Sequence, residues 1–159
     1  VQILLYCTIL FNGGGKMKIA IGSDHAGFEM KEAIKSAFPE IEFVDFGTNS
    51  TESMDYPDTG YPAAKAVAEG KCDKGILICG SGIGMSITAN KVPGIRAALC
   101  GNTDIARLSR LHNDSNILVL AGRFTAIPCA IDITNVWLNT SFEGKRHLNR
   151  INKIHQGER

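Results

Sequence analysis

Cys79 stands where an apolar run enters a glycine-rich turn. The run Ile76–Cys79 is short, rich in β-branched residues and apolar on both faces, which is typical of a strand buried in a parallel sheet. Gly80, Gly82 and Gly84 then allow the backbone to turn and to approach a ligand closely. The pattern therefore predicts a thiol at the carboxyl end of a strand, the edge at which open α/β sheets bind ligands.

A helix predicted over 85–91 begins directly after this turn. Helix N-termini and nearby cations lower the pKa of a thiol from about 8.5 to roughly 3.5–7.5, and free N–H groups in such a turn can stabilise an oxyanion. We therefore interpret Cys79 as a candidate base or nucleophile. The alternative is a structural role, since free cysteine usually behaves as a small buried hydrophobe.

Polar side chains follow other predicted strands at the same edge of the sheet. Ser23, Asp24 and His25 come after the first strand, Tyr56 lies in the long connection after the second, and Arg123 follows the fifth. Structural interpretations exist too, because Asp24 could cap the helix that follows and Tyr56 could belong to a turn. The gathering of these groups at one edge favours a common site.

Two further groups are candidates for acid–base chemistry and phosphate binding. His112 and Asn113 fall between the fourth predicted helix and the fifth strand, where a histidine could instead cap helix carbonyls. Arg146 and Arg150 are four residues apart, so on a helix they project from one face and could grip one phosphate together. The alternative for the two arginines is a solvated basic tail.

Strands and helices alternate along the chain and must position these residues. Strands are predicted over 18–22, 42–47, 76–79, 95–100 and 116–121, and helices over 28–38, 61–69, 85–91, 103–111 and 127–138. Five β/α units with short connections predict a five-stranded parallel sheet with helices on both faces, a three-layer α/β/α Rossmann-like domain. The basic tail over 142–159 is a further helix candidate.

The composition excludes several classes of protein. At 159 residues and 44% apolar, the chain has enough material for one domain with a single core. A net charge of +1 gives no electrostatic case for nucleic acid or an acidic membrane surface, so the expected partner is a small molecule. Five cysteines without a Cys-x-x-Cys pair fit a reducing compartment, and four histidines without metal-ligand spacing predict no metal site.

Residues 1–16 stand apart from this pattern. The uncharged apolar run over 1–11 fits neither a signal peptide nor a membrane span, which needs about 20 apolar residues. We interpret 1–16 as a leader outside the domain, that is a tag, a scar or an upstream extension. Met17 is the expected natural start, and 17–159 the expected domain.

Together the motifs resemble the type B ribose-5-phosphate isomerases, a family that also includes the galactose-6-phosphate and allose-6-phosphate isomerases. The resemblance runs from Met17 to about Arg150. It rests on Gly22-Ser-Asp-His-Ala-Gly-Phe28, Asp55-Tyr-Pro57, Gly75-Ile-Leu-Ile-Cys-Gly-Ser-Gly-Ile-Gly84, Ala89-Asn-Lys91, Gly94-Ile-Arg96, Leu108-Ser-Arg-Leu-His-Asn-Asp114 and Glu143-Gly-Lys-Arg-His147. One branch of the family carries a glutamate base where this chain has Met85, so the chain resembles the cysteine-using branch.

The resemblance implies an aldose–ketose isomerase of the pentose phosphate pathway that uses no metal or organic cofactor. Cys79 would move a proton between C2 and C1 of the open-chain sugar through an enediolate. Ser81 and the N–H groups of 82–84 would stabilise that anion, and His112 would open the furanose ring. The implied substrate-binding set is Asp24, His25, Tyr56, Gly80, Gly82, Ile83, Gly84, Asn113, Arg123, Arg146 and Arg150, of which His25 and the arginines would hold the phosphate.

The family assembles as dimers or dimers of dimers and builds each site across a subunit interface. The Cys79 loop of one chain would then meet His112, Asn113 and the tail arginines of another, so an isolated monomer is expected to be inactive. The expected location is the cytoplasm, with neither nucleic acid nor membrane bound. Two alternatives remain open: an allose-6-phosphate or galactose-6-phosphate isomerase, and a non-catalytic nucleotide-binding module on the same sheet.

Overall fold

The computed structural model describes residues 15–158. The leader predicted over 1–16 therefore lies outside the described residues except for Gly15 and Lys16. No helix in the described part of the chain is long and apolar enough to cross a membrane.

A single sheet of five parallel strands forms the centre of the domain, in the order β2-β1-β3-β5-β4. Its strands are β1 (Lys18–Ser23), β2 (Glu42–Asp45), β3 (Lys74–Cys79), β4 (Ala97–Leu99) and β5 (Ile117–Ala121). The helices are α1 (Phe28–Ala37), α2 (Pro57–Ala68), α3 (Ile83–Asn90), α4 (Thr103–Asn113), α5 (Ile127–Asn139) and α6 (Arg146–Gln156). The predicted three-layer α/β/α fold is confirmed.

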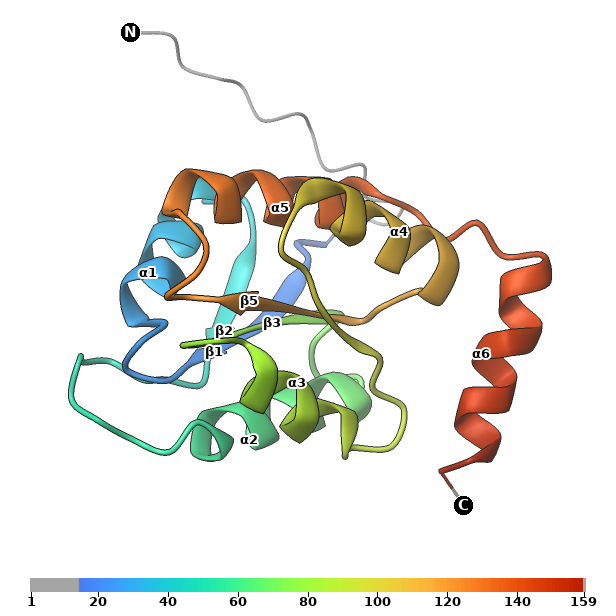
Figure 1. The fold of residues 1–159 in the computed structure, drawn as a ribbon, viewed down its shortest axis with the longest axis horizontal. Helices are drawn as coiled ribbons and strands as arrows, with labels where there is room; N and C mark the ends of the chain where they lie inside the picture. The colour runs from blue at the N-terminus through green and yellow to red at the C-terminus, as the bar shows by residue number, and fades with distance from the viewer. Residues whose placement is uncertain (1–14, 159) are drawn as a thin grey trace, which may run out of the picture.

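Helices cover both faces of the sheet, and each face has its own core. Figure 1 shows α1, α4 and α5 on one face and α2 and α3 on the other, with α6 standing at one end of the molecule. Because side chains alternate along a strand, Ile76 and Ile78 pack under α1 and α5, whereas Leu77 and Cys79 pack under α2 and α3. The Cys79 thiol therefore points towards α2 and α3.

Two helix boundaries differ from the prediction in ways that affect the site. Helix α2 begins at Pro57, four residues before the predicted start, because proline loses nothing at a first helical position whose N–H has no partner there. Helix α4 continues to Asn113, so His112 and Asn113 form its last turn and do not lie in a connection. It ends at Asp114, which is left-handed (φ 44°) and accepts a 2.7 Å hydrogen bond from Arg110 Nη1.

The edge strand β4 is shorter than the predicted strand over 95–100. Asn90 caps it: its Oδ1 accepts from the Ala97 N–H (2.8 Å) and its Nδ2 donates to the Ala97 carbonyl (3.0 Å). These side-chain bonds satisfy groups that an exposed edge would otherwise offer to another strand. The remaining boundaries of β1–β5 and α1–α5 agree with the prediction within two residues, and α6 occupies residues 146–156 of the tail over 142–159.

Candidate active site

Cys79 ends β3 at the carboxyl edge of the sheet, paired with Ala121 of β5. Its side chain is only 3% exposed. The Gly122 N–H donates to the Cys79 carbonyl (2.9 Å), and the Arg123 N–H donates to the Gly80 carbonyl (3.0 Å). These bonds hold the segment that follows β5 directly against the Cys79 loop.

The glycine-rich loop turns sharply into α3. Gly82 has a φ of +75°, and a Cβ there would also collide with Leu99, so the position requires glycine. Ser81 is exposed, and its Oγ accepts a 3.3 Å hydrogen bond from the Ile83 N–H. First-turn N–H groups of a helix, such as that of Gly84, have no partner within the helix, so the start of α3 favours an anion close to the thiol.

Tyr56 and Arg123 lie over this loop, as their positions in the sequence predict. The Tyr56 ring packs on Gly84, and the Arg123 guanidinium lies over Gly80, where a Cβ would be 3.2 Å from Nη1. Arg123 is exposed and Tyr56 is partly exposed. A phenol and a guanidinium from two other parts of the chain therefore border the Cys79 loop.

The segment after β1 completes this edge. The Asp24 N–H donates to the Ile78 carbonyl (3.1 Å), and Asp24 Oδ1 accepts from the Ala26 and Gly27 N–H groups at 2.9 and 3.0 Å. The structural interpretation of Asp24 is thus partly right, because its carboxylate holds the turn before α1. His25 Nδ1 accepts from the Met54 N–H (3.3 Å), which leaves the proton of a neutral ring on Nε2.

The other predicted residues lie at the opposite end of the strands, beside their amino ends. Helix α4 ends directly before β5, so His112 and Asn113 sit beside the amino ends of the strands, whereas Cys79 sits at the carboxyl ends. The five residues of β5 alone span roughly 13 Å. Figure 1 shows the end of α4 and α6 on one side of the molecule and the loop between β2 and α2 on the other. One chain therefore does not bring His112 to Cys79.

His112 has two neighbours that the sequence analysis did not single out, Glu143 and His147. The rings of His112 and His147 stack with centroids 4.3 Å apart and planes 15° apart. Glu143 Oε2 lies 4.0 Å from His112 Nε2 and 3.5 Å from His147 Nε2. Burial lowers the pKa of His147, and the nearby charge of His112 lowers it further. The only sequence signal was the motif that contains both residues.

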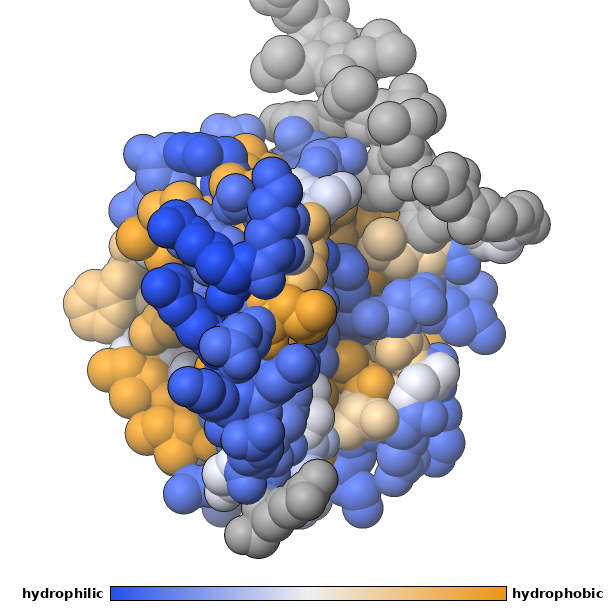
Figure 2. Space-filling view, turned by 90° about the vertical axis from the view of Figure 1, so that its right-hand side faces the viewer, coloured by the Kyte–Doolittle hydropathy of each residue, from blue (hydrophilic) through white to orange (hydrophobic). Residues whose placement is uncertain are grey.

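Arg146 and Arg150 are exposed on α6, where the predicted helical tail is confirmed over Arg146–Gln156. Their four-residue spacing places them on one face of the helix. Figure 2 looks at this end of the molecule and shows a hydrophilic ridge over α6 with apolar side chains on either side. The exposed guanidinium groups can reach an anion outside this chain.

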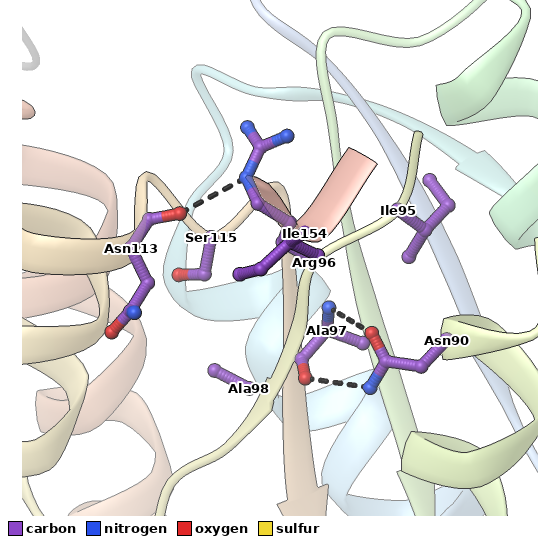
Figure 3. A pocket seen from close by; sticks show the side chains of 8 residues that line it. All are labelled: Asn90, Ile95, Arg96, Ala97, Ala98, Asn113, Ser115 and Ile154. Atoms are coloured by element: carbon purple, nitrogen blue, oxygen red, sulfur yellow. Dashed lines mark hydrogen bonds between the residues drawn. The ribbon is translucent and has the colours of Figure 1, made fainter. Parts of the chain in front are cut away.

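A cavity of about 310 Å³ lies at this same end, between β4, α4 and α6 (Figure 3). It is lined by Asn90, Ile95, Arg96, Ala97, Ala98, Asn113, Ser115 and Ile154. Arg96 Nε donates to the Asn113 carbonyl at 3.0 Å across it. Asn113 is the one predicted site residue in its lining, so this cavity is separate from the Cys79 loop.

The similarity to known proteins extends over almost the whole described domain. The family model of the ribose/galactose isomerases matches residues 19–154. The ribose-5-phosphate isomerase B of Escherichia coli is 46% identical over 139 residues, which are 86% of this chain and 93% of that protein. The D-erythrulose-4-phosphate isomerase of Pectobacterium atrosepticum is 38% identical over 141 residues, 87% of this chain and 93% of that protein.

A solved structure gives the same result for the fold. The ribose-5-phosphate isomerase B of Clostridium thermocellum matches with a TM-score of 0.88 and 52% identity, covering 89% of this chain and 97% of that one. The similarity therefore extends over the sheet, the Cys79 loop and the helical tail together.

Proposed function

Because the chain belongs to the ribose/galactose isomerase family, we propose that it interconverts ribose 5-phosphate and ribulose 5-phosphate. The observation that carries the proposal is the set of side chains gathered at the carboxyl edge of the sheet: Asp24, His25, Tyr56, Cys79 and Arg123. A thiol, polar groups and a guanidinium at one edge supply what an open-chain sugar phosphate needs, namely a base, partners for hydroxyls and a partner for phosphate.

In the proposed reaction the Cys79 thiolate removes the proton from C2 of the open-chain aldose. The electron pair of the C–H bond forms a C1=C2 double bond, and the negative charge moves to the oxygen on C1. The Cys79 thiol, which now holds that proton, gives it to C1. The proton of the C2 hydroxyl moves to O1, and the C2 carbonyl forms. A positioned base of this kind contributes about 10²–10⁴-fold to a rate.

The enediolate formed on the way is an anion and needs donors close to the thiol. Ser81, whose Oγ accepts from the Ile83 N–H, and the N–H of Gly84 in the first turn of α3 would take that role. Donors that are fixed before the reaction are worth more than water, because they need no reorganisation as the charge develops.

Ring opening is assigned to His112 of a second copy of the chain. Within one chain His112 and Cys79 lie at opposite edges of the sheet, so a complete site requires an assembly that places the α4 end of one copy over the Cys79 loop of another. Asn113 and the two arginines of α6 would arrive with it. Arg146 and Arg150 of the second copy would then join His25 and Arg123 around the phosphate.

The direct test is conversion of ribose 5-phosphate to ribulose 5-phosphate by the purified protein, with allose 6-phosphate and galactose 6-phosphate offered in parallel. Turnover of the pentose supports the proposal, and turnover of a hexose alone would reassign the substrate. No turnover, together with a thermal shift by ATP or NAD, would indicate the nucleotide-binding module.

The shared site has its own test, in which two inactive variants are mixed. Cys79→Ala and His112→Asn, unfolded together and refolded, should regain up to about a quarter of the wild-type activity, since a mixed dimer contains one site with both residues intact. Each variant refolded alone should stay inactive. Activity that does not return in the mixture, although the variants co-assemble, would place both residues in one chain's site.

A further inference from the structure

We propose that Glu143 and His147 are positioning residues that hold His112 with one proton and in one orientation for opening the sugar ring. The inference rests on the proposed function, in which His112 performs that step. It concerns a cluster that comes together only through the packing of α6 against the end of α4.

The cluster is held from both sides. The Glu143 N–H donates to the Leu111 carbonyl (3.1 Å), which keeps the carboxylate beside the last turn of α4. Gly144 and Lys145 both have positive φ, 71° and 53°, and turn the chain so that His147 enters the first turn of α6. His147 is 3% exposed and stacks on His112, whose side chain is 38% exposed. The buried ring thus forms a fixed support for the accessible one.

The helix dipoles act on the two histidines with opposite sign. His112 lies in the last turn of α4, where the helix dipole favours a cation, and His147 lies in the first turn of α6, where the dipole disfavours one. Of the charged groups that face His147, Glu143 attracts a proton, whereas His112, Arg146 and Arg150 repel it. These neighbours disfavour a proton on His147, and Glu143 Oε2, 3.5 Å from His147 Nε2 and 4.0 Å from His112 Nε2, lies close enough to both rings to serve as counter-ion to a proton on His112.

A proton fits the geometry better than a metal ion does. The ligand atoms of His112, Glu143 and His147 lie within 4.8 Å of one another, close enough to consider a cation. A zinc ion, however, needs ligand lone pairs that converge on one point about 2.0–2.1 Å from each nitrogen. Rings stacked at 15° hold their Nε2 lone pairs in two separate, nearly parallel planes, so the lone pairs do not meet at one nearby point.

The chemistry of ring opening needs a group in this state. The C1–O4 bond of the furanose breaks, O4 gains a proton, and the C1 carbonyl forms as the O1 hydroxyl loses its proton. Protonated His112 can give its proton to O4 and then take one from O1, which leaves the ring as it began. Glu143 favours the protonated form, and the stack with His147 fixes the plane from which the proton is delivered.

A tetrose substrate separates ring opening from the later proton transfer. D-Erythrose 4-phosphate carries its phosphate on the hydroxyl that would close a five-membered ring, so its isomerisation needs no ring opening. The relative named D-erythrulose-4-phosphate isomerase makes four-carbon phosphates reasonable substrates to offer. A variant impaired only in ring opening should lose the pentose reaction and keep the tetrose reaction.

The test compares Glu143→Gln, His147→Phe and His147→Ala with Arg150→Met as control. We expect Glu143→Gln to lower kcat/KM for ribose 5-phosphate at least about tenfold and to change that for erythrose 4-phosphate by less than about twofold. His147→Phe, which keeps a ring against His112, should retain more pentose activity than His147→Ala. Arg150→Met should lower both reactions alike, because both substrates carry a phosphate.

A second readout is the pH profile of kcat/KM for ribose 5-phosphate. Loss of the Glu143 charge destabilises protonated His112, so the alkaline limb should move to lower pH in Glu143→Gln. An unmoved alkaline limb, or equal losses on both sugars, would overturn the inference and leave a structural role for Glu143. If wild type does not convert the tetrose, the pH profile decides. If wild type converts neither sugar, the proposed function fails instead.

Discussion

The ring of Tyr56 rests directly on the backbone of Gly84. A Cβ at position 84 would lie 2.5 Å from the Tyr56 Cζ and 2.8 Å from Cε1 and Cε2. Tyr56 immediately precedes α2, and Gly84 lies in the first turn of α3, so the contact joins two helix N-termini beside the Cys79 loop.

Gly84→Ala should therefore impair catalysis more than stability. The added methyl must displace the Tyr56 ring, which is partly exposed and can swing outward at a cost of about 1 kcal/mol. We expect turnover of ribose 5-phosphate to fall at least about tenfold, because the phenol leaves the site. Gly101→Ala is the control, since a Cβ there meets nothing within 4 Å. Equal activity of both variants would show that the Tyr56 position is unimportant.

Cys79 can be compared with a second cysteine in the same buried cluster. Cys72 and Cys79 are 4% and 3% exposed and belong to the same buried cluster, but only Cys79 lies at the carboxyl end of β3. Replacing either with alanine should cost about 1 kcal/mol of unfolding free energy. Only Cys79→Ala should lose isomerase activity, by about 10²-fold or more. Similar activity losses in the two variants would point to packing and not to chemistry.

A buried ion pair ties α1 to β2. The Lys31 side chain is fully buried, and its Nζ lies 2.7 and 2.6 Å from the two Asp45 carboxylate oxygens. Lys31→Met should lower the free energy of unfolding by about 1–2 kcal/mol, because the partly buried carboxylate loses one of its two lysine partners and keeps Lys35 at 2.7 Å. Lys18→Met, which removes an exposed pair with Glu42, should cost less than about 1 kcal/mol. Denaturant unfolding measures both.

The same carboxylate predicts how stability depends on pH. Burial alone would raise the pKa of Asp45, but hydrogen bonds from Lys31 and Lys35 outweigh it and hold the pKa below its usual value. The resulting stability is present above the unfolded-state pKa of about 3.9 and is lost as the pH falls through the lower folded-state pKa. Unfolding free energy should therefore fall less steeply below pH 4 in Asp45→Asn than in wild type. If the unfolding free energy falls equally steeply below pH 4 in both proteins, Asp45 does not cause this pH dependence.

Arg96 joins the ends of α4 and α6. Its Nη1 lies 2.8 Å from His155 Nε2, and its Nη2 donates to the Asp114 carbonyl at 2.8 Å. Since a guanidinium only donates, His155 Nε2 accepts and its Nδ1–H donates to Glu158. Arg96→Met should raise amide exchange in α6 about tenfold and increase KM for ribose 5-phosphate, as Arg146 and Arg150 lose their fixed support.

The control for that experiment is Arg107→Met, which removes an exposed pair with Asp104 on the same helix α4. It should leave both exchange and KM unchanged. If α6 exchanges at the wild-type rate in Arg96→Met, packing of the helix alone holds it in place.

Local patterns in the sequence predicted most of the elements correctly. The apolar run ending at Cys79 could only be a strand of limited length, and the glycines after it could only be a turn, because both properties depend on neighbouring residues. The start of α2 was missed because Gly60 and Pro62 disfavour a helix by propensity, whereas packing of its first turn on the sheet decides the matter. His112 was placed in a connection because its helix ends without glycine, at the left-handed Asp114.

By itself, then, the sequence determined the succession of strands and helices along the chain, the Cys79 loop and the family resemblance, because periodicity and motifs depend on residues that are close in sequence. The tertiary structure alone decided which of the named residues meet. It joins Tyr56 to Gly84 and His112 to His147, and it leaves His112 and Cys79 at opposite edges of one sheet. Such contacts depend on how helices pack across the sheet, and the spacing of side chains along the sequence does not predict that packing.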